Sequence, residues 1–179
     1  MADISDFYAL EDTREQIYEG VYPFVCAQAN LIDKKITVDE KEVDTKAVVL
    51  YLETVQPVPF PNGTNDKLVV KSEYNFISKN NYQRNALTGI SHAMGIEKFR
   101  NTSEFEGKTC MLGVSNRVWQ DNEGNDRYSV QIANFGFAYA PIPPQGGEIK
   151  YLANDLPNAS DEEKSTWFKN TLAMYKQPK

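Results

Sequence analysis

Residues 110–135, CMLGVSNRVWQDNEGNDRYSVQIANF, predict two β-strands joined by a polar turn, and this stretch decides the fold. Apolar side chains share one face: Leu112, Val114 and Val118 in the first strand, and Tyr128, Val130 and Ile132 in the second. The opposite face carries Ser115, Arg117 and Trp119, then Arg127, Ser129 and Gln131. Gly124, in the turn, is able to adopt a positive φ. We therefore expect a hairpin with one core face and one face that places a tryptophan between arginines.

Three strands and a helix are expected before this hairpin. The strands span residues 20–32, 47–55 and 67–77, which are rich in β-branched and aromatic residues. The charged segment 33–46 is predicted to be a loop or an exposed hairpin. Residues 80–96, NNYQRNALTGISHAMGI, then change to helical spacing of the apolar side chains.

The ends of the predicted helix have ordinary signals. Asn80 or Asn81 is able to cap its start, and Gly95 fits its end. Three strands, a helix and a two-stranded hairpin follow one another in the layout of an OB-fold. The sequence therefore predicts a mainly β protein: a five-stranded OB-fold-like barrel, with a helix between strands three and four and a second helix at the C-terminus.

The last part of the chain differs in composition from the predicted barrel. After a Pro- and Gly-rich strap, Ser160 and Glu163 form a capping box that begins the C-terminal helix. Its apolar stripe comprises Phe168, Leu172 and Tyr175, with Trp167 and Met174 beside them. This stripe either packs back onto the barrel or docks on another protein, such as a replication protein or a second subunit. We accordingly divide the chain into an acidic N-terminal segment (1–19), the barrel (20–137), and the strap with its helix (138–179).

The net charge of −6 arises near the N-terminus, because residues 1–45 hold 11 acids and 4 bases. Residues 46–135 hold 9 acids and 10 bases, which permits a local basic groove despite the acidic total. No apolar run approaches the length of a membrane span, and the first 20 residues lack the pattern of a signal peptide. We expect a cytoplasmic protein with no membrane partner.

Catalytic and metal-binding motifs are not apparent in the sequence. There is no Gly-rich phosphate loop, no nucleophile elbow and no Cys or His cluster, so we expect neither an enzyme nor a cofactor or metal site. Cys26 and Cys110 are interpreted as two small buried residues in strands.

The face with the tryptophan suggests single-stranded DNA as a ligand. Such a strand presents a line of phosphates, which need cations, and a row of unpaired bases, which stack on flat rings. Arginine contributes both as a phosphate partner and as a stacking plane. The candidate DNA-binding residues are Arg117, Trp119 and Arg127 from the hairpin, Lys67 and Lys71 from the third strand, and Tyr22 and Phe24 as a further aromatic platform. In the structural alternative, Trp119 shields the mouth of the barrel and the arginines only solubilise its edge.

Several segments of the chain resemble a family of small bacteriophage early proteins of unknown function. The resemblance runs from residue 17 to residue 137, through EGVYPFVCAQANLI, AVVLYLETV, AMGIEKF, FEGKTCMLGV and QIANF. Its marks are Gly20 with Tyr22, the turn at Gly95, and residues 104–108 (EFEGK), which stand where the family has a Glu-x-Gly-Lys step. That family is similar in layout to phage single-stranded DNA-binding proteins with OB-folds, which implies a role in phage DNA replication or recombination in the host cytoplasm.

One departure from those proteins concerns the end of the chain. Many phage and bacterial single-strand binders end in an acidic tail that recruits partners, whereas this chain ends in MYKQPK. The acidic N-terminal segment is a possible substitute. Two functions therefore remain: a sequence-tolerant single-stranded DNA-binding protein, and a phage structural or inhibitory protein that uses its acidic N-terminal segment and C-terminal helix on a protein partner.

Overall fold

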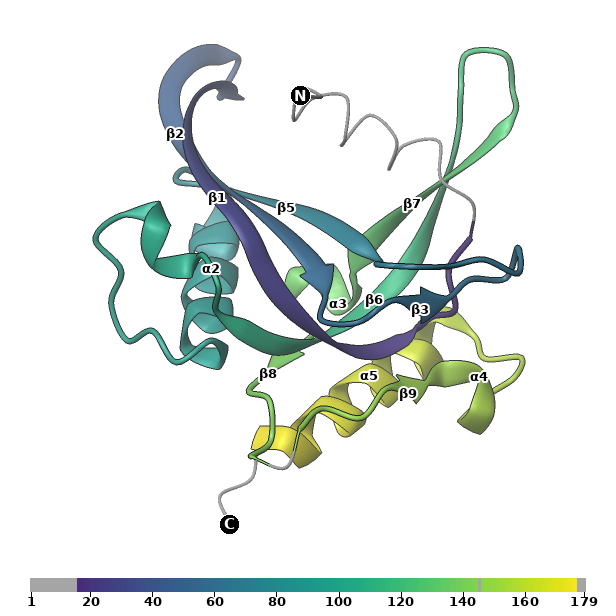
Figure 1. Cartoon of the computed structure of the whole chain (residues 1–179). Helices are drawn as coiled ribbons and strands as arrows, with labels where there is room; N and C mark the ends of the chain where they lie inside the picture. Colours follow the sequence, from purple (N-terminus) through teal and green to yellow (C-terminus); the bar gives the residue numbers. More distant parts are fainter. Residues whose placement is uncertain (1–15, 145, 177–179) are drawn as a thin grey trace.

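A computed structural model describes residues 16–144 and 146–176 as a mainly β structure with helices on its outside (Figure 1). The strands are β1 (Gly20–Val38), β2 (Lys41–Thr54), β3 (Val58–Pro59), β4 (Asn65–Asp66), β5 (Val69–Asn75), β6 (Thr109–Gln120), β7 (Asp126–Ile132), β8 (Tyr139–Ala140) and β9 (Lys150–Tyr151). The helices are η2 (Lys79–Asn81), α2 (Tyr82–Ala93), η3 (Thr102–Phe105), α3 (Ala133–Gly136), α4 (Leu152–Asp155) and α5 (Asp161–Lys176).

The main sheet is antiparallel and has the strand order β5-β2-β1-β6-β7. Strand β1 is shared: its first residues pair with β6, and the rest pairs with β2 across a bulge between Cys26 and Gln28. Bulges bend a strand, so one strand is able to serve two partners on a curved sheet. The end strands β5 and β7 approach each other, but in the described part of the chain no hydrogen-bonded ladder closes the sheet.

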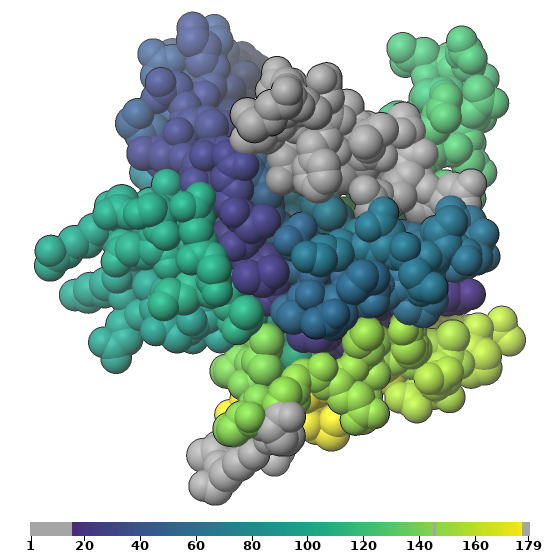
Figure 2. Space-filling view, in the orientation of Figure 1, coloured from purple at the N-terminus to yellow at the C-terminus, as the bar shows by residue number. Residues whose placement is uncertain are grey.

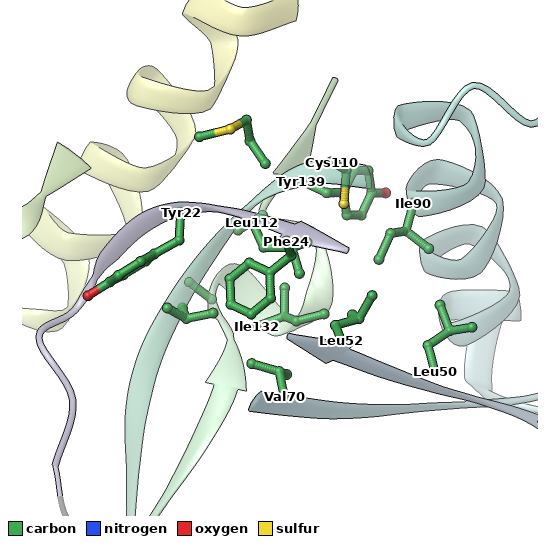
Figure 3. Packing of buried hydrophobic residues seen from close by; sticks show 14 of the residues in the cluster. Tyr22, Phe24, Leu50, Leu52, Val70, Ile90, Cys110, Leu112, Ile132 and Tyr139 are labelled. Atoms are coloured by element: carbon green, nitrogen blue, oxygen red, sulfur yellow. The ribbon is translucent and has the colours of Figure 1, made fainter. Parts of the chain in front are cut away.

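The inner face of this curved sheet holds the core. Phe24 lies at its centre, with Leu52, Val70, Leu112 and Ile132 around its ring (Figure 3). Full burial of such a side chain contributes about 1.5–3 kcal/mol relative to leaving it in water. Alternation along each strand decides which residues share this face, and the curvature of the sheet turns the face inward.

Helix α2 covers one end of the core with Ala86, Leu87 and Ile90. It ends as the sequence predicted, because Gly95 has a φ of +83°. Its start differs from the prediction, since Asn81 occupies the N-cap position without a side-chain capping bond.

Two hairpins extend the sheet beyond its core, one at each upper corner in Figure 2. Strand β1 continues to Val38 rather than ending near residue 32, so segment 33–46 is the exposed hairpin of the two expected alternatives. Its turn residues Asp39 and Glu40 both have positive φ, which matches the right-handed twist of the strands. The β6–β7 hairpin turns at Gly124, whose φ is +80°, as predicted.

The C-terminal part belongs to the same body. Strands β8 and β9 pair with β6 and β1, and α5 packs against the outer face of the sheet with Trp167, Phe168 and Leu172 buried (Figure 1). The predicted capping box is present, because the Ser160 and Glu163 side chains each accept a hydrogen bond from the other residue's N–H, at 3.2 and 3.1 Å. The apolar stripe therefore packs back onto the sheet. Most of the predicted acidic segment 1–19 lies outside the described residues.

Candidate nucleic-acid interface

The outer face of the β6–β7 hairpin brings three candidate residues together. Trp119 pairs directly with Arg127, and Arg117 pairs with Ser129, two residues further along each strand. Cross-strand partners point to the same face of a sheet, so Arg117, Trp119 and Arg127 share one surface. Arg117 is exposed, and Trp119 and Arg127 are half-buried.

The other face of the hairpin corrects one prediction. Val114 is fully buried as expected, but Val118 is 56% exposed although it was assigned to the same core face. Val118 is exposed because the hairpin is long and extends past the last strand that could cover its core face (Figure 2).

The two arginines differ in their partners. The Arg127 Nε donates to Asp121 Oδ2 at 2.9 Å. Asp121 also accepts the backbone N–H of Glu123 and of Asn125, and the Asn125 bond, then the Arg127 pair, hold the pKa of its carboxyl below the usual range. Arg117 has neither an ion pair nor a hydrogen bond from its guanidinium among residues 16–144 and 146–176. It is therefore the cation of this face that is available to a ligand.

At its base the hairpin face opens into a groove of about 450 Å³ between the hairpin, α3 and the first turn of α5. Its walls include Arg117, Gln131, Phe135, Asp161 and Lys164. The groove thus continues the surface of Trp119 and Arg117 toward an aromatic side chain that the sequence analysis did not select.

That aromatic side chain is Phe135, which is 87% exposed. Its backbone is left-handed, with a φ of +59°, which is unusual for a bulky residue. The conformation is held by its neighbours: Tyr82 Oη donates to the Phe135 carbonyl at 2.5 Å, and Asn134 Nδ2 donates to the Ser165 carbonyl at 3.1 Å. Strained non-glycine backbone of this kind clusters at ligand-binding and active sites, so Phe135 is a candidate contact residue.

The two candidate lysines lie elsewhere on the sheet. Lys67 precedes β5, and its Nζ is 3.5 Å from the Glu53 carboxylate. Lys71 lies in β5 opposite Tyr51, and its side chain is exposed. Neither lysine lines the groove beside Phe135. The structure therefore groups the hairpin residues with each other and leaves the lysines on a neighbouring strand.

Tyr22 and Phe24 are not available as a stacking platform, which corrects the sequence-based assignment. Both are fully buried, and their rings lie among the core residues (Figure 3). Tyr22 Oη donates to the Tyr18 carbonyl at 2.5 Å, and burial raises its pKa well above the ordinary value. Alternation along β1 gave the two rings a common face correctly, but this face points inward.

The remaining reactive side chains are buried or dispersed. Cys26 and Cys110 are buried in strands as predicted, and burial raises the pKa of Cys26 to about 12, so its thiol stays protonated near neutral pH. The described residues hold no cluster of three His, Cys, Asp or Glu side chains suited to a metal ion. Over the same residues, no helix has the length and apolar character required to cross a bilayer.

Comparison with known proteins yields no match, either to a family model or to a curated protein sequence.

Proposed function

We propose that this protein binds single-stranded DNA, with little sequence preference, along the outer face of the β6–β7 hairpin. The observation that carries the proposal is one surface on which Arg117, which has no ion pair among residues 16–144 and 146–176, lies between half-buried Trp119 and the protruding ring of Phe135. We refer to these three residues as the hairpin site.

The chemistry of the hairpin site suits a single strand. Stacking of a base on an aromatic ring contributes about 1–3 kcal/mol and tolerates any base, because every base has a π-face. In duplex DNA these faces are hidden, so the aromatic side chains favour unpaired bases. An exposed guanidinium without a carboxylate partner is able to contact phosphate without first breaking an ion pair.

Acidic residues are also present near the hairpin site. Glu19 lines the same groove, but its carboxylate is 3.0 Å from Lys164 Nζ, which balances its charge. Asp121 lies at the turn and is balanced by Arg127. Asp161 is the groove acid that has no ion pair among the described residues. We therefore expect modest affinity that depends on stacking as much as on charge.

The topology supports the same function. We propose an OB-fold-like arrangement, since β1 pairs with both β2 and β6, as the first strand of such a barrel does. In OB-folds the loops after the first and fourth strands contribute to oligonucleotide binding. Here those positions are the β1–β2 and β6–β7 hairpins. The role in phage DNA replication or recombination remains a prediction from the resemblance.

The protein-interaction alternative has less support in the described structure. Its proposed docking element, α5, buries Trp167, Phe168 and Leu172 on this chain's own sheet. The larger part of the acidic segment that would assist it lies outside the described residues.

Fluorescence anisotropy with labelled oligonucleotides tests the proposal. We expect the protein to bind an oligo-dT of about 16 nucleotides, the upper end of an OB-fold site, more tightly than a duplex of the same length. The affinity should fall as salt rises, because phosphate contacts release counterions. Equal affinity for both forms, or no binding at low salt, would overturn the proposal.

A further inference from the structure

A second hollow lies next to the groove of the hairpin site, on the other side of the Glu19–Lys164 ion pair. It has a volume of about 610 Å³, within the range of small-molecule sites. Glu19, Asn116 and Lys164 line both this hollow and the groove beside Phe135. The two spaces are therefore neighbours with a shared wall.

Aromatic side chains form part of this second hollow. Tyr18 is 43% exposed, and its ring meets the edge of Tyr151 at a centroid distance of 6.2 Å. Tyr151 also contacts the buried Tyr22, at a centroid distance of 5.8 Å and nearly perpendicular. Tyr151 is therefore a fixed wall, while Tyr18 presents its ring to whatever enters the hollow.

Some polar groups of this hollow already have hydrogen-bond partners within the protein, and others are open to a ligand. Asn116 exchanges two hydrogen bonds with the backbone of Ile17, at 2.8 and 3.1 Å, so its amide is engaged. Lys164 Nζ donates to Glu19 at 3.0 Å and has further N–H groups at the border of the two spaces. The rim residues Asn154 and Asn158 are exposed and offer amides to the edge of a planar ligand.

We propose that this hollow, which we call the Tyr18 pocket, takes one unstacked base of the same single strand that occupies the hairpin site. The intervening phosphate contacts Lys164 at the shared wall. This inference rests on the proposed single-strand binding. It extends the DNA path from the hairpin around the start of α5 and makes affinity depend on strand length.

The test compares two oligo-dT lengths, about 4 and about 16 nucleotides, the limits of OB-fold sites. Tyr18→Ala should weaken binding of the long strand by about 5- to 150-fold, the range for one lost stack, and leave the short strand unchanged. Tyr18→Phe is the matched control, because it keeps the ring and the carbonyl that accepts from Tyr22. It should bind both lengths like the wild type.

A second pair of variants keeps the inference testable if Tyr18→Ala does not fold. Asn158 is exposed at the rim, so Asn158→Glu adds a negative charge there, and Asn158→Gln adds none. The Glu variant should lose affinity for the long strand only, by several-fold, and the Gln variant should not.

The outcomes separate this inference from the proposed function. If Trp119→Ala weakens the long strand but Tyr18→Ala, or Asn158→Glu in its place, does not, the Tyr18 pocket is wrong and the hairpin site stands. Equal weakening of both lengths also overturns the pocket. If the wild type binds neither strand, both proposals fail.

Discussion

The β1–β2 and β6–β7 hairpins both project beyond the core, and each has a net charge of −1. Residues 31–46 of the first hold five acids and four bases, and residues 115–131 of the second hold three acids and two bases. The first hairpin has no aromatic residue, whereas the second has Trp119 and Tyr128. Net charge therefore does not distinguish the two.

Their pairing does distinguish them. On the first hairpin, Lys34, Lys35 and Lys46 each lie within 4.0 Å of a carboxylate, at 2.9, 3.9 and 2.6 Å. Lys41, the fourth base, has no ion pair among the described residues, but this hairpin has no aromatic residue for it to lie beside. On the second, Arg117 has no such partner in the part of the chain that the structure describes, and it lies beside a tryptophan. Under the proposed function, a cation that is both unpaired and beside an aromatic ring, rather than the number of cations, distinguishes the second hairpin.

The largest expected difference between the two hairpins is in how much a substitution in each lowers the free energy of unfolding. Gly113 lies in β6 below its hairpin, and a Cβ there would be 2.6 Å from Phe168 Cδ1 on α5. Gly113→Val should lower the free energy of unfolding by about 1–3 kcal/mol, because the side chain overpacks this contact. Thr37→Val on the exposed β1–β2 hairpin should change it by less than about 0.5 kcal/mol. Urea denaturation measures both, and equal losses would show that α5 does not anchor the second hairpin.

Removing the aromatic ring should have the next largest effect. Trp119→Ala should weaken single-strand binding by about 1–3 kcal/mol at every salt concentration, because stacking releases no counterions. Val38→Ala on the other hairpin should not alter binding. Titrations with oligo-dT at several salt concentrations measure the effect, and melting curves identify any loss of folding. Wild-type binding by Trp119→Ala would assign the tryptophan to the structure.

Phe135→Ala should cost about 1 kcal/mol of binding, the lower end of the stacking range, because one face of the groove stays open to water. The melting temperature should not change, since the ring is 87% exposed. Phe135→Tyr retains a ring and should bind like the wild type. A lower melting temperature without loss of binding would contradict a role in recognition.

Arg117→Ala should give a smaller, several-fold loss of affinity with a characteristic salt dependence. The slope of log affinity against log salt should flatten by about 0.7, the increment for one single-strand phosphate contact. Lys35→Ala, which removes a lysine already paired with Glu42, should leave the slope unchanged. Arg127→Ala should flatten it less than Arg117→Ala, because Asp121 already pairs with Arg127. Equal slopes for Arg117→Ala and Lys35→Ala would remove the distinction between the hairpins.

Lowering the pH should have the smallest effect, confined to one cross-strand contact of the first hairpin and the turn of the second. The Lys46 hydrogen bond lowers the pKa of Asp33, and the Asn125 N–H, followed by Arg127, lowers that of Asp121. Both pKa values are depressed in the folded state, so these contacts are complete above the usual aspartate pKa of about 3.9 and are lost as pH falls through the folded value.

Nuclear magnetic resonance distinguishes the titration of Asp121 from that of Asp33. On acidification the amide signals of Glu123 and Asn125 should shift with Asp121, because their N–H groups donate to it. Asp33 should instead move the signals of Lys46. Asp121→Asn should abolish the first titration. An Asn125 amide that does not titrate would contradict the account of the turn.

Local signals in the sequence were sufficient for the elements themselves. The turn at Gly124, the stop at Gly95 and the capping box of Ser160 with Glu163 each depend on a few neighbouring residues, and all three are present. The shared face of Arg117 and Trp119 follows equally directly, because side chains alternate along a strand.

Tertiary context determined the rest. Alternation assigned Tyr22 and Phe24 to one face of β1, but only the curvature of the sheet decides that this face is inside. Val118 keeps the core periodicity beyond the point where the core ends. Phe135 carried no strand or helix pattern, and the one available signal was the Asn134–Phe135–Gly136 sequence, in which asparagine and glycine favour left-handed backbone.

The shared strand β1 also has a consequence for synthesis. Gly20 pairs with Val114, about ninety residues later in the chain. At roughly 5–20 residues per second, a ribosome needs several seconds to make β6 after β1 has emerged. During that interval the edge of β1 and the inner faces of three finished strands have no cover. Folding of the sheet therefore waits for a late, long-range closure, which predicts slow refolding of the isolated protein.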